Sequence, residues 1–319
     1  PKVRGMLGES ELAVGDYTRA VDDLSQFVKL VPNNAQAHYS LARAYAGDRD
    51  RNGYYRELKT VVELDEKHIK ARTELVKILL AEKNTAEAGR HIEIIRSQTK
   101  DQPEVLALEG KHAALTGDTQ RAIEAYQQAF KTQQTNYNLL RLESVLWQAG
   151  KRDDAVKMLE TWTQEYPDDS LTLTQLAGRY LVLEQNEKAI TTYERVFELV
   201  PDNVVVLNNL AWLYMDRDGG RALEYAEKAY SLAPESPEIL DTTAMVVHKR
   251  DTARAKKLLD RALDKKPDNP TLLFHKALIL KEHGNTEKAL NIVQSLVEQD
   301  REFPEKGKAR QLLKELGGD

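Results

Sequence analysis

A repeat with a period of about 34 residues constrains what this chain can fold into more than any other feature. Prolines mark the repeat, because each follows a helical apolar pattern and precedes Asn, Asp or Glu: Pro32, Pro167, Pro201, Pro234 and Pro267. The last four follow one another at single periods, and the interval between the first two makes four such periods. Proline has no N–H to donate and disfavours helix in the residue before it, so each should end a helix at the same point of the repeat.

The copy at residues 170–203 shows the pattern most clearly and predicts two helices in a hairpin. Its apolar residues recur at spacings of three and four, which places them on one face of each helix. They are Leu173, Leu176 and Tyr180 in the first helix, and Ala189, Ile190, Tyr193, Val196 and Leu199 in the second. The polar run 184–187 makes the turn. One hairpin cannot bury its apolar faces alone, so the pattern predicts one stack of hairpins rather than two ordinary domains.

Alanine or glycine recurs at one fixed point of each helix. The first-helix series is Gly8, Ala42, Gly110, Ala177, Ala211, Ala244 and Ala277, and the second-helix series is Ala20, Ala88, Ala122, Ala155, Ala189, Ala222, Ala255 and Ala289. Such residues let two helix backbones cross closely, which larger side chains would prevent. Tyr54 and Glu143 interrupt the series, and we expect looser packing and room for a kink where Tyr54 follows the polar turn 47–53.

This period, with small and large residues at fixed places, resembles the tetratricopeptide repeat (TPR) family. The resemblance covers nearly the whole chain and implies an all-α superhelical solenoid of about nine helix-turn-helix repeats with a C-terminal capping helix. We expect the repeats at residues 1–34, 35–68, 69–102, 103–135, 136–169, 170–203, 204–236, 237–269 and 270–303, and the cap at 304–319. Because Pro1 is in phase with the repeat and no cap precedes it, we also expect a fragment with further repeats upstream.

Charge and composition argue against several classes of protein. Lys and Arg number 46 against 51 Asp and Glu, and a net charge of −5 argues against general nucleic-acid binding, which needs a basic excess. There is no cysteine, so disulfides and cysteine-ligated metals are excluded. No apolar run approaches the roughly 18 residues of a membrane-spanning helix.

No catalytic or cofactor-binding constellation stands out in the sequence. The seven histidines are His38, His68, His91, His112, His248, His275 and His283. No two of them lie four residues apart on one helix, no carboxylate pairs with two of them at ligand spacing, and there is no P-loop or glycine-rich dinucleotide turn. We therefore expect a non-enzymatic protein without metal or cofactor, whose histidines are solvated or half-buried.

The family resemblance also implies a binding surface, because the first helices of TPR proteins line a concave groove that holds an extended or helical peptide. The positions of this chain that correspond to the groove by repeat phase include a basic amino-terminal zone of Tyr39, Arg43, Lys70, Lys77 and Lys111. It also gives a central aromatic zone of Tyr137, Trp147, Asn208, Trp212 and Met215. The basic zone suits an acidic segment or a carboxylate, and the aromatic zone suits apolar anchors with an amide for a peptide backbone. The alternative is that the aromatics pack between repeats and the lysines form an ordinary solvated surface.

Other first-helix positions share the phase of the groove, among them Leu181, Asp241, Met245, His248 and Phe274. The two-carboxylate clamp of chaperone-binding TPR domains needs Lys and Asn on successive first helices. Asn208 and Asn209 are present, but Thr174 and Gly178 stand where the lysine would be needed. A receptor for chaperone tails is therefore not expected.

The last third of the chain carries a closer resemblance. The runs 207–212, 222–229, 239–242 and 303–305 are similar to the carboxy-terminal region of bacterial TPR lipoproteins associated with exosortase (PEP-CTERM) and exopolysaccharide systems. This resemblance implies a scaffold in the bacterial periplasm or envelope, lipid-anchored in the full-length protein, that serves exopolysaccharide export or surface-protein sorting.

Together these features predict a non-catalytic scaffold whose partners are proteins bound as peptide segments. Three alternatives remain open: the targeting arm of a larger enzyme, a cytosolic TPR adaptor, and a solenoid that binds polysaccharide. An export signal or a catalytic domain in the full-length gene would separate the first two. Titration with polysaccharide and with peptide libraries would test the third.

Overall fold

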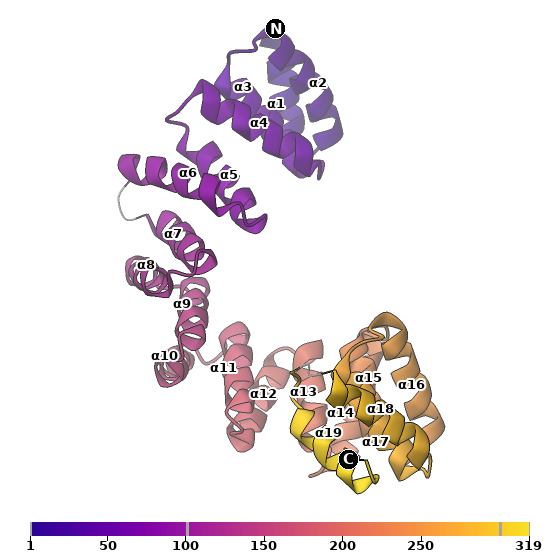
Figure 1. Ribbon diagram of the computed structural model, residues 1–319. Helices are drawn as coiled ribbons and strands as arrows, with labels where there is room; N and C mark the ends of the chain where they lie inside the picture. Colours follow the sequence, from indigo (N-terminus) through magenta and orange to yellow (C-terminus); the bar gives the residue numbers. More distant parts are fainter. Residues whose placement is uncertain (1, 100–101, 300–301, 319) are drawn as a thin grey trace. The chain divides into compact units, whose positions relative to one another are not determined.

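The computed structural model describes residues 2–99, 102–299 and 302–318, which form nineteen α-helices and no strand (Figure 1). The expected all-α class is therefore confirmed. In chain order the helices are α1 Lys2–Val14, α2 Tyr17–Leu30, α3 Ala35–Gly47, α4 Arg51–Leu64, α5 Ile69–Ala81, α6 Thr85–Gln98, α7 Pro103–Leu115, α8 Thr119–Thr132, α9 Asn136–Gln148, α10 Arg152–Glu165, α11 Ser170–Val182, α12 Asn186–Leu199, α13 Val204–Tyr214, α14 Gly219–Leu232, α15 Pro237–Val247, α16 Thr252–Lys265, α17 Pro270–Glu282, α18 Thr286–Glu298 and α19 Lys306–Glu315.

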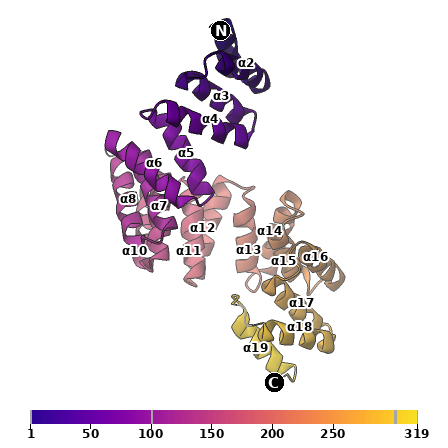
Figure 2. The same cartoon turned by 45° about the horizontal axis from the view of Figure 1, so that its top comes forward.

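The helices follow one another as hairpins, each an odd-numbered first helix and an even-numbered second helix (Figures 1 and 2). Each of the nine ranges expected above encloses one such pair, and α19 lies in the range expected for the cap. The repeat boundaries themselves stay a prediction, and Pro1 lies outside the described residues.

Short polar side chains begin most of the helices. The residue just before the helix accepts a hydrogen bond from a backbone N–H of the first turn, which satisfies a donor that the helix itself cannot. Residues of this kind are Asp16, Asn34, Asp50, Asn84, Asp118, Asp169, Asn203, Asp218, Asp251 and Asn269. These helices therefore begin at a capping residue that recurs at the same point of the repeat.

The small-residue series lie where the paired helices cross. Every alanine of both series is fully buried. Gly110 of α7 is buried too, and a Cβ atom added to it would lie 2.8 Å from the Tyr126 ring of α8. That distance is shorter than any ordinary contact, so the crossing has no room for another carbon atom.

The second repeat packs as closely as the others, and the looser packing expected at Tyr54 was wrong. Gly53, one position earlier, is the small buried residue of α4, and a Cβ atom there would lie 2.7 Å from the Tyr45 ring. Tyr54 is half-buried instead, and its hydroxyl donates to Glu74 of α5 at 3.3 Å. The crossing point has shifted by one residue along the helix.

The chain divides into two compact units, Pro1–Met158 and Leu159–Asp319, and the boundary lies inside α10. In unit 1, α5 packs against α7 and α7 against α9, besides the packing within hairpins. In unit 2, α13 packs against α15 and α15 against α17. First helices therefore lie beside first helices within each unit.

Helix α19 covers the end of unit 2. Its buried residues Ala309, Leu312 and Leu313 pack in one cluster with Phe274 of α17 and Val293 of α18. Within the described part of the chain, none of the helices has the length and apolar character needed to span a membrane.

Candidate functional site

Two hollows on the first helices contain residues of the expected groove, one hollow in each unit. The unit-1 hollow, of about 470 Å³, lies over α5, α7 and α9, and its lining includes Lys77, Glu104, Lys111, Tyr137, Asn138 and Arg141. The unit-2 hollow, of about 400 Å³, lies over α11, α13, α15 and α17, and its lining includes Leu181, Asn208, Trp212, Glu238, Asp241, Lys266, His275 and Glu305. Each is large enough for a few side chains of a bound segment.

The unit-1 hollow combines three basic side chains with one exposed aromatic ring. Tyr137 is 66% exposed, so its ring is available for contact. Lys77 Nζ donates to Glu74 at 2.8 Å and contacts Glu104 at 2.7 Å. Burial opposes the charge on Lys77, but the hydrogen bonds with the two carboxylates outweigh it and raise the pKa of this lysine. Lys111 of α7 is exposed and lines the same hollow, which therefore offers positive charge together with an aromatic ring.

An aromatic side chain and a buried, hydrogen-bonded Asp–His pair meet in the unit-2 hollow. Trp212 is 39% exposed, and its ring centroid lies 5.5 Å from that of His275. His275 Nδ1 lies 2.8 and 2.9 Å from the two carboxylate oxygens of Asp241. Asp241 and His275 are only 8% and 3% exposed, so their pairing is what makes burial of both tolerable. The hollow therefore joins three successive first helices, α13, α15 and α17.

Electrostatics in the unit-2 hollow are set mainly by carboxylates. Burial raises the pKa of Asp241, the hydrogen bond and charge of His275 oppose that rise, and the negative charges of Glu305 and Glu238 add to it. Lys266 Nζ donates to Glu238 Oε1 at 2.5 Å, and this hydrogen bond is the main reason that the pKa of Glu238 falls to about 2. Glu238 thus stays ionised but is already paired.

Two further polar groups point to where a ligand atom could bind. The Oδ1 atom of Asn208 is buried and has no hydrogen-bond partner among the described residues. A buried acceptor left unpaired is costly, so Asn208 favours a ligand that brings a donor. Glu305, just before α19, accepts a hydrogen bond from the Thr271 hydroxyl at 2.9 Å.

The structure gathers half of the ten groove residues expected from the sequence into the two hollows. Lys77, Lys111 and Tyr137 line the unit-1 hollow, and Asn208 and Trp212 line the unit-2 hollow. Their role in binding stays a prediction.

The other five expected groove residues lie outside both hollows. Tyr39 packs against the His68 ring at 4.6 Å, and Arg43 is exposed with its guanidinium 3.9 Å from Glu9. Lys70 is exposed at the start of α5. Trp147 and Met215 are half-buried against hydrophobic clusters, and the Arg152 guanidinium lies 5.3 Å from the centre of the Trp147 ring.

The expectation that all histidines are solvated or half-buried was wrong for His248 and His275, which are both buried. His248 Nδ1 lies 2.6 Å from the Met245 carbonyl oxygen and Nε2 lies 2.8 Å from Glu282. These hydrogen bonds supply the partners that let an imidazole leave water. For His275 the repeat phase gave no signal, because the repeat 237–269 has 33 residues and the residue in phase with Asp241 is therefore Phe274.

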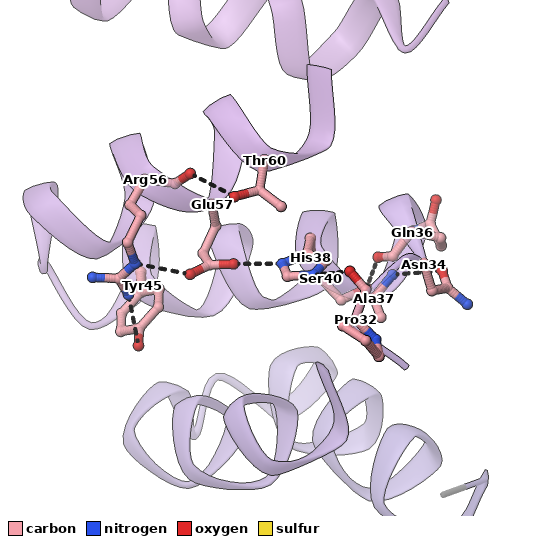
Figure 3. Close-up of polar contacts among 10 residues, drawn as sticks. All are labelled: Pro32, Asn34, Gln36, Ala37, His38, Ser40, Tyr45, Arg56, Glu57 and Thr60. Atoms are coloured by element: carbon pink, nitrogen blue, oxygen red, sulfur yellow. Dashed lines mark hydrogen bonds and ion pairs between the residues drawn. The ribbon is translucent and has the colours of Figure 1, made fainter. Parts of the chain in front are cut away.

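A polar network in the second repeat is structural (Figure 3). Glu57, which is buried, accepts from His38 Nδ1 at 2.7 Å and from Arg56 Nε at 3.1 Å. His38 Nε2 lies 3.0 Å from the carbonyl oxygen of Pro32, and Arg56 donates to the Tyr45 hydroxyl at 3.4 Å. The network joins α4 to α3 and to the turn before it. Across residues 2–99, 102–299 and 302–318 there is no group of three His, Asp or Glu side chains placed to hold a metal ion.

Comparison with known proteins agrees with this architecture. Two models of the tetratricopeptide repeat match the chain, at residues 6–51 and 247–313. A chain in the crystal structure of the APC/C hetero-tetramer Cut9–Hcn1 is similar, with a TM-score of 0.60 and 13% identity. That alignment covers 94% of the present chain and 59% of the other, so the present chain spans under two thirds of its length.

Two shorter structures are also similar: the crystal structure of MamA protein and the MamA RS-1 ArsTM double mutant. Their identities are 20% and 24%, each aligns with 53% of this chain, and the alignments cover 94% and 96% of the MamA chains. Both have a TM-score of 0.44. A search of curated proteins found no match.

The family models identify tetratricopeptide repeats at residues 6–51 and 247–313. The likeness to the Cut9–Hcn1 structure concerns the fold, and the expected helical repeat solenoid is confirmed. TPR repeats are generally non-catalytic scaffolds that bind other proteins, so the fold suggests a protein–protein interaction scaffold. None of these matches tests the resemblance to exosortase-associated lipoproteins, which stays a prediction.

Proposed function

We propose that this chain is a non-catalytic scaffold that binds peptide segments of partner proteins along its first helices. One observation carries the proposal: in each unit the first helices form a hollow that displays an aromatic side chain, Tyr137 in unit 1 and Trp212 in unit 2. Exposed aromatic rings beside polar groups are typical anchors of protein interfaces. Extended or helical segments fit such hollows, because their side chains enter while their backbone stays at the rim.

The two hollows favour different segments. Lys77, Lys111 and Arg141 outnumber Glu104 in the unit-1 hollow, so an acidic segment is its natural ligand. Polysaccharide binding by the same aromatic side chains is the competing function, since sugars also stack on exposed rings. Peptide selection with aromatic variants separates the two.

A selection from a random peptide library displayed on phage tests the proposal. Peptides selected on the parent protein should bind Tyr137→Ala or Trp212→Ala at least about tenfold more weakly, because truncation of a central aromatic anchor typically costs 2 kcal/mol or more. Tyr166→Ala is the matched control, because Tyr166 is 41% exposed but lies outside both hollows.

The proposal is wrong if selected peptides bind the parent and both hollow variants equally, since the ligand would then lie elsewhere on the chain. It is also wrong if no peptide is selected but an acidic exopolysaccharide binds and Tyr137→Ala or Trp212→Ala abolishes that binding. Circular dichroism of each variant confirms that loss of binding is not loss of fold.

We also propose that the full-length protein works in the bacterial periplasm or envelope, in exopolysaccharide export or surface-protein sorting. Only the resemblance of the runs within residues 207–305 supports this placement. Fractionation of the source cells, followed by immunoblotting, tests it. Recovery with the envelope fraction supports the proposal, whereas recovery with the cytosol favours a cytosolic adaptor. A catalytic domain in the full-length gene would favour the targeting arm of an enzyme.

A further inference from the structure

We propose that the unit-2 hollow binds the guanidinium group of an arginine side chain presented by the partner segment. The inference rests on the proposed function and deepens it, because it names the side chain that one of the two hollows selects. It also separates this hollow from the basic unit-1 hollow, whose ligand carries the opposite charge.

The first step is a balance of charges. Lys266 is the only lysine or arginine of the described hollow lining, and Glu238 already pairs with it. Asp241 and His275 hydrogen-bond to each other, so this pair supplies no cation to neutralise Glu305. The Glu305 carboxylate accepts from the Thr271 hydroxyl and forms no ion pair with a described lysine or arginine, so its charge is uncompensated there. The hollow therefore carries net negative charge.

The second step concerns the shape of the cation. Trp212 presents an indole ring that is partly exposed at the hollow, and a planar guanidinium stacks on such a ring better than an ammonium group does. The hollow of about 400 Å³ exceeds the volume of a guanidinium group, so the ligand keeps room for its aliphatic stem.

The third step concerns the hydrogen bonds. Asn208 Oδ1 is a buried acceptor without a donor, and it lies on α13 four residues before Trp212, on the same helix face. Glu305 offers a second acceptor from a different element. Arginine has five N–H donors in a fixed fork, so it can donate to acceptors on two elements at once. A carboxylate ligand would instead meet Glu305 and Asp241, and would be repelled.

Short capped peptides provide the test. The probe is acetyl-Gly-Gly-Arg-Gly-Gly-amide, and its matched control carries citrulline, which has nearly the same shape but no charge. Binding is followed by the ¹H–¹⁵N signals of the tryptophan indoles at constant ionic strength. Trp212→Phe identifies the Trp212 signal. The arginine peptide should shift this signal saturably, and the citrulline peptide should bind at least about tenfold more weakly, since hydrogen bonds between charged groups are stronger than those of a neutral donor.

Variants of the protein provide the second arm. Glu305→Gln keeps an acceptor for Thr271 but removes the charge, and it should weaken the arginine peptide by about tenfold. Glu224→Gln is the matched control, because Glu224 is exposed on the second helix α14, outside the hollow, and the affinity should not change. Thermal unfolding of both variants checks that the unit is intact.

Equal binding of the arginine and citrulline peptides overturns the inference, and so does an unchanged affinity in Glu305→Gln. The outcome for the proposed function is read separately. If library peptides depend on Trp212 but show no preference for arginine, the scaffold function stands and this inference falls. If library peptides bind independently of both hollows, the scaffold function falls as well.

Discussion

A single methyl group added at Gly110 tests how closely the paired helices cross. The new Cβ atom would lie 2.8 Å from two ring atoms of Tyr126, a side chain that is only 7% exposed. Overpacking a core costs roughly 1–3 kcal/mol. Alanine in place of glycine inside a helix gains roughly 0.5–1 kcal/mol. The overpacking cost is larger, so Gly110→Ala should lower the free energy of unfolding by about 1 kcal/mol.

Gly178→Ala is the matched control for this substitution. Gly178 also lies inside a first helix, α11, but a Cβ atom there would meet only the Tyr193 hydroxyl at 3.6 Å, an ordinary contact. Only the gain in helix propensity remains, so this variant should be more stable by roughly 0.5–1 kcal/mol.

Urea unfolding followed by circular dichroism measures both changes, and hydrogen exchange of peptides from α7–α8 and α11–α12 assigns them to the right hairpins. The two variants should move in opposite directions. If Gly110→Ala were as stabilising as Gly178→Ala, the Tyr126 ring would have to yield easily, and the close crossing inferred here would be refuted.

Two further predictions follow from packing and from charge. Ala211 is fully buried where α13 meets α14, so Ala211→Leu should lower the free energy of unfolding by roughly 1–3 kcal/mol, and an unchanged melting temperature would show that the repeat phase is wrong. The hydrogen bond from Lys266 lowers the pKa of Glu238 from 4.5 to about 2, so this pair stabilises the folded chain above about pH 4.5 and its contribution is lost as the pH falls through 2. Because the two side chains are 46% and 59% exposed, Glu238→Gln should cost under about 1 kcal/mol at neutral pH and nothing below pH 2, as measured by urea unfolding. A cost that persisted in acid would rule out the ion pair as its cause.

The helices and their crossings could be predicted from the sequence because every repeat must satisfy the same packing requirement. A crossing needs a small residue in every hairpin, and this need recurs in phase from Gly8 to Ala289. A single repeat is less informative, as Tyr54 shows. The second repeat meets the requirement with Gly53, one residue away, which only the packing against Tyr45 reveals.

Which side chains remain available for binding was harder to predict. Trp147 and Trp212 both lie on first helices, and the sequence gives no reason to separate them. In the structure Trp147 packs against a hydrophobic cluster with Arg152 beside its ring, whereas Trp212 is partly exposed beside His275. The difference depends on neighbours from other helices. The Asp241–His275 pair was equally hard to predict, because the residue in phase with Asp241 is Phe274, one position before His275.

The packing of helices with their neighbours in the chain has a consequence for how the protein is made. Helices that pack together, such as α13, α14 and α15, emerge from the ribosome one after another. At roughly 5–20 residues per second, one repeat takes roughly 2–7 seconds to synthesise. Helical proteins with local contacts fold in about a millisecond or less. Each hairpin therefore has time to pack against the preceding hairpin before the next one is translated. Few apolar helix faces stay exposed to solvent in the growing chain.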